Sequence, residues 1–208
     1  LWLHVDGAYG ALFVLTERHS ETLRPAGLAD SLSLDPHKLL FGSLEAGCVL
    51  FRREEDARRS FDFRASYIHQ REDQDLVDFT DLGPELSRSN RALKVWWGLR
   101  GFGARAFRQT LENLLTLADR MGQRIEAEDE LELLAPISLT AVCFRHRDLD
   151  GEQNAQLLER VVRSGVAHLG PAHVAGRAGI RACFTNLRTR PSDVDTVIDG
   201  ILDLAGSP

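Results

Sequence analysis

A short apolar stretch that ends at a proline constrains the fold of this chain more than any other feature. Residues 32–40 read Leu-Ser-Leu-Asp-Pro-His-Lys-Leu-Leu, and the run over residues 31–34 predicts a short buried strand. Pro36 cannot donate a hydrogen bond to a sheet, and it pushes the preceding residue out of the helical region. The chain must therefore turn at Asp35-Pro36, which presents Lys38 just beyond the end of a strand.

Apolar residues follow Lys38 in the sequence. Leu39, Leu40 and Phe41 come directly after it. An ammonium group in apolar surroundings loses hydration, which favours the neutral amine and makes it a usable nucleophile. Taken alone, the stretch fits a surface lysine beside a turn equally well.

The first ten residues predict a second strand that ends on a carboxylate. They read Leu-Trp-Leu-His-Val-Asp-Gly-Ala-Tyr-Gly, so the apolar run stops at Asp6 and small residues follow. Open α/β sheets bind ligands at the carboxyl ends of their strands. Gly7, Ala8 and Gly10 would let a flat ligand approach the backbone closely. A lone Asp-Gly is more often a turn, but its combination with Lys38 is more specific.

Three stretches together resemble the group II pyridoxal-phosphate-dependent amino acid decarboxylases. They are His-Val-Asp-Gly-Ala-Tyr at 4–9, Asp-Ser-Leu-Ser-Leu-Asp-Pro-His-Lys at 30–38 and Glu-Ala-Gly-Cys-Val-Leu at 45–50. The family includes the aromatic L-amino acid, histidine, tyrosine, glutamate and diaminobutyrate enzymes, and the similarity extends from Leu1 to about Ala205. The resemblance implies an α/β chain of the pyridoxal-phosphate transferase fold type I.

The resemblance also implies roles for individual residues. Lys38 would form the Schiff base with pyridoxal 5'-phosphate, and Asp6 would pair with the pyridine nitrogen. Ala8 would pack under the ring, and His37 would lie near the phosphate. Tyr67, in Ala-Ser-Tyr-Ile-His, would protonate the carbanion that remains after carbon dioxide leaves. A buried structural tyrosine is the alternative.

Two domains are expected. Residues 1–103 would be the C-terminal part of a large parallel-sheet domain, with a mobile catalytic loop over residues 64–90. Residues 104–208 would form a linking helix and a small α+β domain. The chain starts inside a predicted strand rather than at a methionine, so we expect the C-terminal part of a longer enzyme, inactive as 208 residues alone.

Periodicity predicts the elements of the second half. Residues 91–100 read as a helix with Leu93, Trp96 and Trp97 inward, broken at residues 101–103, before a long amphipathic helix. Further strands are expected at 131–134, 140–145, 166–169 and 180–184. A capping box at Asp150 and Gln153 predicts one helix that Gly165 ends, and Ser192 and Asp195 open another. These two helices would cover one face of an antiparallel sheet.

Composition excludes several classes of partner. A net charge of −6 argues against a basic surface that would bind nucleic acid. The sequence contains no run of eighteen apolar residues, so no membrane span is predicted. The N-terminus lacks the basic flank and cleavage site of a signal peptide. Cys48, Cys143 and Cys183 lie in apolar runs, which favours buried reduced thiols and a cytoplasmic location. The histidines show no metal-ligand spacing, so no metal site is expected.

These observations lead to one hypothesis with alternatives. We expect decarboxylation of an L-amino acid, aromatic by the overall look of the motifs, by a homodimer with its active site at the interface. The alternatives are aldehyde formation or carbon–carbon cleavage with the same cofactor, and a non-catalytic truncated piece. Leu39 stands where the family often has tryptophan, which bears on specificity. Arg181, inside an apolar strand, needs a partner, and a structural acid is favoured over a substrate carboxylate.

Overall fold

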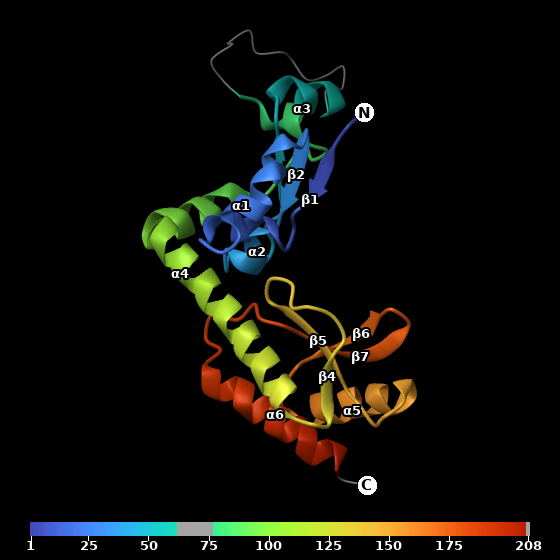
Figure 1. Cartoon of the computed structure of the whole chain (residues 1–208). Coiled ribbons are helices and arrows are strands. Elements are labelled where there is room, and N and C mark those ends of the chain that lie inside the picture. The colour runs from blue at the N-terminus through green and yellow to red at the C-terminus, as the bar shows by residue number, and fades with distance from the viewer. Residues whose placement is uncertain (62–76, 207–208) are drawn as a thin grey trace. The chain divides into compact units, whose positions relative to one another are not determined.

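The computed structural model describes residues 1–61 and 77–206 (Figure 1). Its contacts cluster into two compact units, Leu1–Ala104 and Arg105–Pro208. Each unit is described by itself below. Tyr67 and much of the expected catalytic loop lie outside the described residues.

A three-stranded sheet organises the first unit, in the order β1-β2-β3. β1 (His4–Asp6) runs parallel to β2 (Ser31–Leu34), with Asp6 opposite Ser33. The crossover between them consists of three short pieces: η1 (Ala11–Leu15), α1 (Ser20–Leu23) and η2 (Arg24–Leu28). The strand predicted over residues 31–34 and the α/β class are confirmed.

The third strand gives this sheet a mixed character. β3 (Cys48–Phe51) is antiparallel to β2, with Leu34 opposite Cys48. The connection contains only the short helix α2 (Pro36–Leu39), so it leaves and re-enters the sheet at the same edge. The β1–β2 pair is parallel, as the sequence led us to expect, and β3 adds an antiparallel strand that the sequence did not predict. α3 (Glu54–Phe61) and η3 (Phe79–Leu82) complete the short helices of the unit.

The helix α4 (Arg91–Ala127) begins in the first unit and ends in the second. The break expected at residues 101–103 lies at Gly103, whose φ of 76° and ψ of 157° are not helical. Only glycine adopts such a conformation without strain. The prediction that Leu93, Trp96 and Trp97 point inward is wrong, because these residues are 40%, 54% and 63% exposed. The guanidinium of Arg100 lies over the Trp96 ring, 6.0 Å from its centroid.

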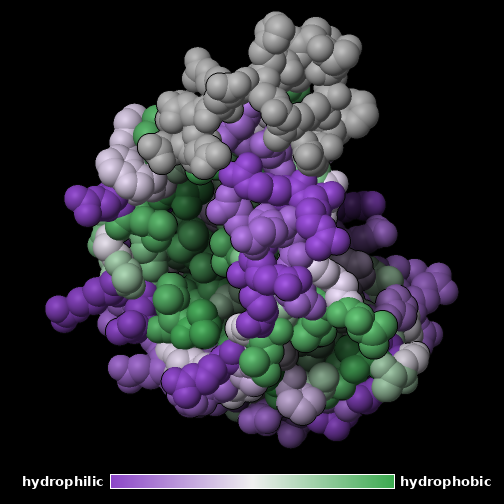
Figure 2. All heavy atoms as spheres, turned by 90° about the horizontal axis from the view of Figure 1, so that it is seen from above, coloured by the Kyte–Doolittle hydropathy of each residue, from purple (hydrophilic) through white to green (hydrophobic). Residues whose placement is uncertain are grey.

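Several other large apolar side chains of the first unit are exposed. Figure 2 shows apolar residues gathered in green areas on the face seen from above. The exposed set in this unit includes Trp2, Leu3, Val49, Leu50, Phe79 and Phe102. In contrast, Phe13 and Leu39 are fully buried and belong to the core of this unit.

The second unit is an antiparallel sheet with two helices, as predicted. β4 (Leu131–Leu133), β5 (Ala141–His146), β7 (Arg177–Cys183) and β6 (Gly170–Val174) lie in that order. α5 (Gly151–Ser164) packs against β7, and α6 (Pro191–Ala205) packs against α5. The core joins side chains of both layers: Phe144, Leu157, Ile180, Ile198 and Ile201.

In this unit the sequence predicted the starts of the helices well and the bounds of the strands less well. The capping box of Asp150 and Gln153 is present, with bonds of 2.8 and 2.9 Å. α6 begins one residue before the predicted Ser192, because Pro191 occupies its first turn. The strand expected at residues 166–169 is wrong, since pairing starts at Gly170.

The described helices include none that is both long and apolar enough to cross a membrane. All three cysteines are free thiols. Burial raises the pKa of the Cys48 thiol, as expected for a thiol in an apolar run. Cys48 and Cys143 are only half-buried and Cys183 is exposed, so the prediction that all three thiols are buried is wrong.

Candidate functional site

The carboxyl ends of β1 and β2 bring Asp6 and the turn before Lys38 to one edge of the sheet. This follows from the parallel pairing, in which Asp6 lies opposite Ser33 and Asp35 follows β2 two residues later. Parallel strands end at the same edge, which is where ligands bind in open α/β sheets. Two of the predicted site residues are therefore close in space although they lie far apart in the sequence.

One oxygen of the Asp6 carboxylate is held and the other is available. Oδ1 accepts a hydrogen bond from the Ala8 backbone N–H at 3.1 Å and from the Ser33 hydroxyl at 3.1 Å. Oδ2 makes no hydrogen bond within the part of the chain that the structure describes. The carboxylate is thus oriented and keeps one acceptor oxygen for a ligand.

The same hydrogen bonds keep Asp6 ionised. The Ala8 N–H lowers the pKa of the carboxyl most, the Ser33 hydroxyl lowers it next, and His4 and Lys38 add smaller favourable charge interactions. Hydrogen bonds and positive charges favour the charged form of an acid. An ionised carboxylate at this position suits a cationic partner such as a protonated ring nitrogen.

Gly7 serves the packing of the strand end rather than a ligand. Its N–H donates to the Ser33 carbonyl at 3.0 Å. A Cβ atom at this position would lie 2.8 Å from that carbonyl oxygen and 2.5 Å from the Ala11 Cβ. The close approach that the sequence suggested is therefore between protein atoms, and any larger residue would displace the segment that carries Asp6 and Ala8.

Lys38 pairs with an acid instead of lying among apolar side chains. Its Nζ atom is 2.7 Å from an Asp35 carboxylate oxygen, one helical turn away, and its side chain is 41% exposed. α2 turns the chain so that Leu39 enters the core while Lys38 stays at the surface. The expectation of an apolar environment is wrong for this reason. The lysine is accessible to a ligand from solvent.

His37 is oriented by the backbone of the following loop. Its Nδ1 lies 2.6 Å from the Ala46 carbonyl oxygen and 3.3 Å from the Ala46 nitrogen. The shorter contact requires that Nδ1 carry the proton and donate it to the carbonyl. Nε2 makes no hydrogen bond among the described residues. The imidazole therefore presents Nε2 to whatever binds next to it.

Four residues of this site were missed in the sequence. Ser33 holds Asp6, Asp35 holds Lys38, and Ala46 holds His37. Arg91 binds Glu45, the residue before Ala46. Only Asp35 had a sequence signal, because residues three apart face each other on a helical turn. The others depend on sheet register or on loop packing, which the sequence does not display.

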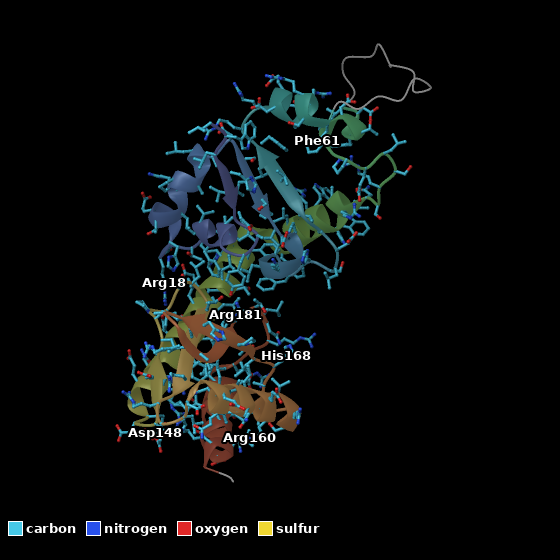
Figure 3. The ribbon with its side chains drawn as sticks, turned by 90° about the vertical axis from the view of Figure 1, so that its right-hand side faces the viewer. Arg18, Phe61, Asp148, Arg160, His168 and Arg181 are labelled. Carbon is cyan, nitrogen blue, oxygen red and sulfur yellow. The ribbon has the colours of Figure 1, made fainter. Side chains whose placement is uncertain are left out.

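Two further predicted residues fall outside this arrangement. Tyr67 lies outside the described residues, so its role stays a prediction. Arg181 is exposed on β7, opposite Cys143 and Gly170 (Figure 3). It has no hydrogen bond or ion pair within residues 1–61 and 77–206, so the favoured structural acid is not found there. No group of three or more potential metal ligands occurs in the described ranges.

Known proteins similar to this chain are about twice as long or longer. An aromatic-L-amino-acid decarboxylase of Bacillus atrophaeus is 35% identical over 99% of this chain and 45% of its own length. A 3,4-dihydroxyphenylacetaldehyde synthase of Drosophila melanogaster is 33% identical over 94% of this chain and 38% of its own length. The chain therefore spans less than half the length of these relatives.

A solved structure and a family model extend the comparison. The crystal structure of Catharanthus roseus tryptophan decarboxylase in complex with L-tryptophan has a TM-score of 0.86 and 25% identity, covering 98% of this chain and 43% of that one. The family model of the pyridoxal-dependent decarboxylase conserved domain matches residues 1–147. This chain belongs to the pyridoxal-dependent decarboxylase family, whose cofactor is pyridoxal phosphate.

Proposed function

We propose that this chain carries the lysine-bearing part of the active site of a decarboxylase that converts an aromatic L-amino acid to its amine and carbon dioxide. The observation that carries the proposal is the meeting of Asp6, His37 and Lys38 at one sheet edge. In this proposal Lys38 is the Schiff-base lysine, Asp6 and His37 bind the cofactor, and Ala8 packs under its ring.

The geometry fits pyridoxal phosphate on three counts. Lys38 offers an accessible amine, since its side chain is 41% exposed. Asp6 keeps an ionised carboxylate with one oxygen unengaged, which suits a ring N–H. His37 presents Nε2 outward, because Nδ1 is occupied by the Ala46 carbonyl. An amine can condense with the aldehyde of the cofactor, a carboxylate can pair with its pyridine nitrogen, and an imidazole can bind its phosphate.

When bound, the cofactor supplies an electron sink for the pair of electrons that the departing carboxylate leaves behind. Asp6 holds a proton on the ring nitrogen, because its ionised form is stabilised by the Ala8 N–H and the Ser33 hydroxyl. Asp35 holds the Lys38 side chain beside the site through its carboxylate. Tyr67, in the interpretation drawn from the sequence, delivers a proton to the α-carbon.

The substrate class rests on similarity. The Bacillus relative is an aromatic-L-amino-acid decarboxylase, and it is 35% identical to this chain. The Drosophila relative, an aldehyde synthase, supports a second candidate reaction with the same cofactor. Tyr67 favours decarboxylation, because a proton donor completes the amine product. A homodimer with the site at its interface and a cytoplasmic location remain predictions.

The test uses the native polypeptide that contains these residues. Purified protein is incubated with pyridoxal phosphate and a panel of L-amino acids, and carbon dioxide, amine and aldehyde are quantified. Borohydride reduction followed by peptide mapping then locates the modified lysine. The chain has only two lysines, so label on Lys38 and none on Lys94 is the expected result. Aldehyde as the main product would favour the second candidate, and label on Lys94 would refute the assignment of Lys38.

A further inference from the structure

Arg91 binds two acids that come from different segments of the first unit. Its Nε and one terminal nitrogen lie 3.0 and 2.6 Å from the same Glu45 oxygen, 46 residues earlier. Its other terminal nitrogen lies 2.7 Å from a Glu85 oxygen. The guanidinium thus joins the loop of residues 42–47 to the segment that precedes α4.

The position of Arg91 disfavours a role in helix stability. Arg91 is the first residue of α4. The N-terminus of a helix carries partial positive charge, so a cation there is unfavourable. The two carboxylates offset this cost. The pKa of Glu85 is lowered, first by its hydrogen bond from Arg91 and then by the charge of that guanidinium, so the acid stays ionised. The residue therefore acts on its acidic partners rather than on its helix.

A short path leads from Arg91 to His37. Glu45 is joined covalently to Ala46, which is buried. The Ala46 carbonyl accepts the hydrogen bond from His37 Nδ1 at 2.6 Å. A displacement of Glu45 would move that carbonyl and rotate the imidazole. Arg91 is the group that holds Glu45 in the described part of the chain.

The Glu85 arm is itself braced. Arg88 donates to the Phe79 carbonyl at 2.6 Å and to the Glu85 carbonyl at 3.0 Å. These bonds fold the segment of residues 79–88 back on itself and help to hold the backbone at Glu85. A guanidinium fork can bind both acids at once, whereas a lysine ammonium acts as a single point charge.

We propose that Arg91 is a positioning residue for cofactor binding, which it assists by holding Glu45 and Ala46 so that His37 Nε2 faces the phosphate group. The inference rests on the proposed function, because it takes His37 as the phosphate-side residue. It assigns a role to a residue whose side chain binds Glu45 and Glu85. Its effect should be confined to ligands that carry the phosphate.

The experiment compares pyridoxal phosphate with pyridoxal, which lacks the phosphate. Both are titrated by imine absorbance into the native polypeptide and its Arg91→Ala, Arg91→Lys and Glu45→Gln variants. Arg24→Ala is the matched control, because Arg24 pairs with Glu21 on the same unit and both are largely exposed. Exposed ion pairs contribute modestly, so Arg91→Ala should weaken pyridoxal phosphate binding about fivefold. Pyridoxal affinity should change less than twofold, because pyridoxal lacks the phosphate group that His37 would face.

The two remaining variants refine the result. Glu45→Gln keeps the shape of an exposed side chain and removes its charge, so it should weaken pyridoxal phosphate binding about twofold, even if Arg91→Ala does not fold. Arg91→Lys should lie between the wild type and Arg91→Ala. In the Glu45→Gln background, Arg91→Ala should have a smaller effect, because the two residues act in series.

The outcomes separate this inference from the proposed function. Failure of the wild type to bind either ligand would refute the proposed function. Equal loss of pyridoxal and pyridoxal phosphate affinity in Arg91→Ala would show general damage and overturn the positioning role. Unchanged affinity for both ligands in Arg91→Ala and Glu45→Gln would overturn it as well, while the proposed function would stand.

Discussion

The Lys38 ammonium lies 2.7 Å from the Asp35 carboxylate, across one turn of α2. Asp35 also precedes the helix, and its backbone carbonyl accepts a hydrogen bond from the Lys38 N–H at 2.9 Å. One residue thus holds the lysine at both its backbone and its side chain. This pairing keeps the amine at the sheet edge, where the charge of Lys38 helps to lower the pKa of the Asp6 carboxyl.

Lys38→Ala is expected to abolish turnover and the absorbance of the imine with pyridoxal phosphate, since the ε-amino group is the proposed point of attachment. Both are measured on the native polypeptide by carbon dioxide release and visible spectroscopy. Lys94→Ala is the control, because Lys94 is the other lysine of these 208 residues and lies on α4. Normal imine absorbance in Lys38→Ala would reassign the attachment site.

Asp35→Asn should slow turnover by up to about fivefold, the upper range for a partly exposed ion pair. The variant keeps the shape of the side chain and the backbone acceptor but removes the charge that holds the ammonium. The rate of imine formation after mixing with pyridoxal phosphate is the direct measurement. If that rate and kcat are both unchanged, the pairing is a surface contact without a role in the site.

Asp6→Asn should reduce kcat by at least tenfold while leaving the fold intact. A carboxylate beside a cationic nitrogen shifts its pKa by one to a few units, and about 1.4 kcal/mol accompanies each unit. An amide cannot hold the ring nitrogen in its protonated state. Circular dichroism controls for folding and carbon dioxide release measures activity. Turnover close to that of the wild type would remove Asp6 from the mechanism.

Ser33→Ala should raise the pKa of Asp6, because it removes the second of the two hydrogen bonds that lower it. A carboxyl whose folded pKa is depressed stabilises the fold above its unfolded pKa, and this stabilisation is lost as pH falls through the folded pKa. The variant should therefore lose stability near neutral pH and converge with the wild type in acid. Carboxyl ¹³C NMR measures the pKa of Asp6 in both proteins. Unfolding at neutral and at acid pH compares their stabilities. Parallel stability curves at all pH values would contradict it.

Tyr67→Phe is expected to slow amine formation by about 10²–10⁴-fold, the range for a lost general acid. Cofactor affinity should change little, because the proposed role is proton delivery and not binding. Amine and aldehyde are quantified together, since an unprotonated carbanion can be diverted to oxygen. Unchanged amine formation would mean that Tyr67 is structural.

Local signals in the sequence were sufficient for some elements. The strand of residues 31–34 was predicted because Pro36 ends it, and the helix after Asp150 was predicted because its capping box is a contact between near neighbours. The inward placement of Trp96 and Trp97 failed, since periodicity shows which residues share a helix face but not what covers that face. The prediction of an apolar environment for Lys38 was wrong for a related reason, because adjacent residues on a short helix face different directions.

The sequence by itself determined which residues are candidates for the site and where the strands next to them end. Asp6 and Lys38 could be named as candidates because Asp6 is the last residue of one strand and Lys38 follows the turn that ends another. Only the tertiary structure decided that Ser33 orients Asp6, that β3 returns antiparallel, and that Arg91 reaches Glu45 across 46 residues. These relationships depend on register and loop closure, which are set by the free energy of the whole fold and leave no local pattern in the chain.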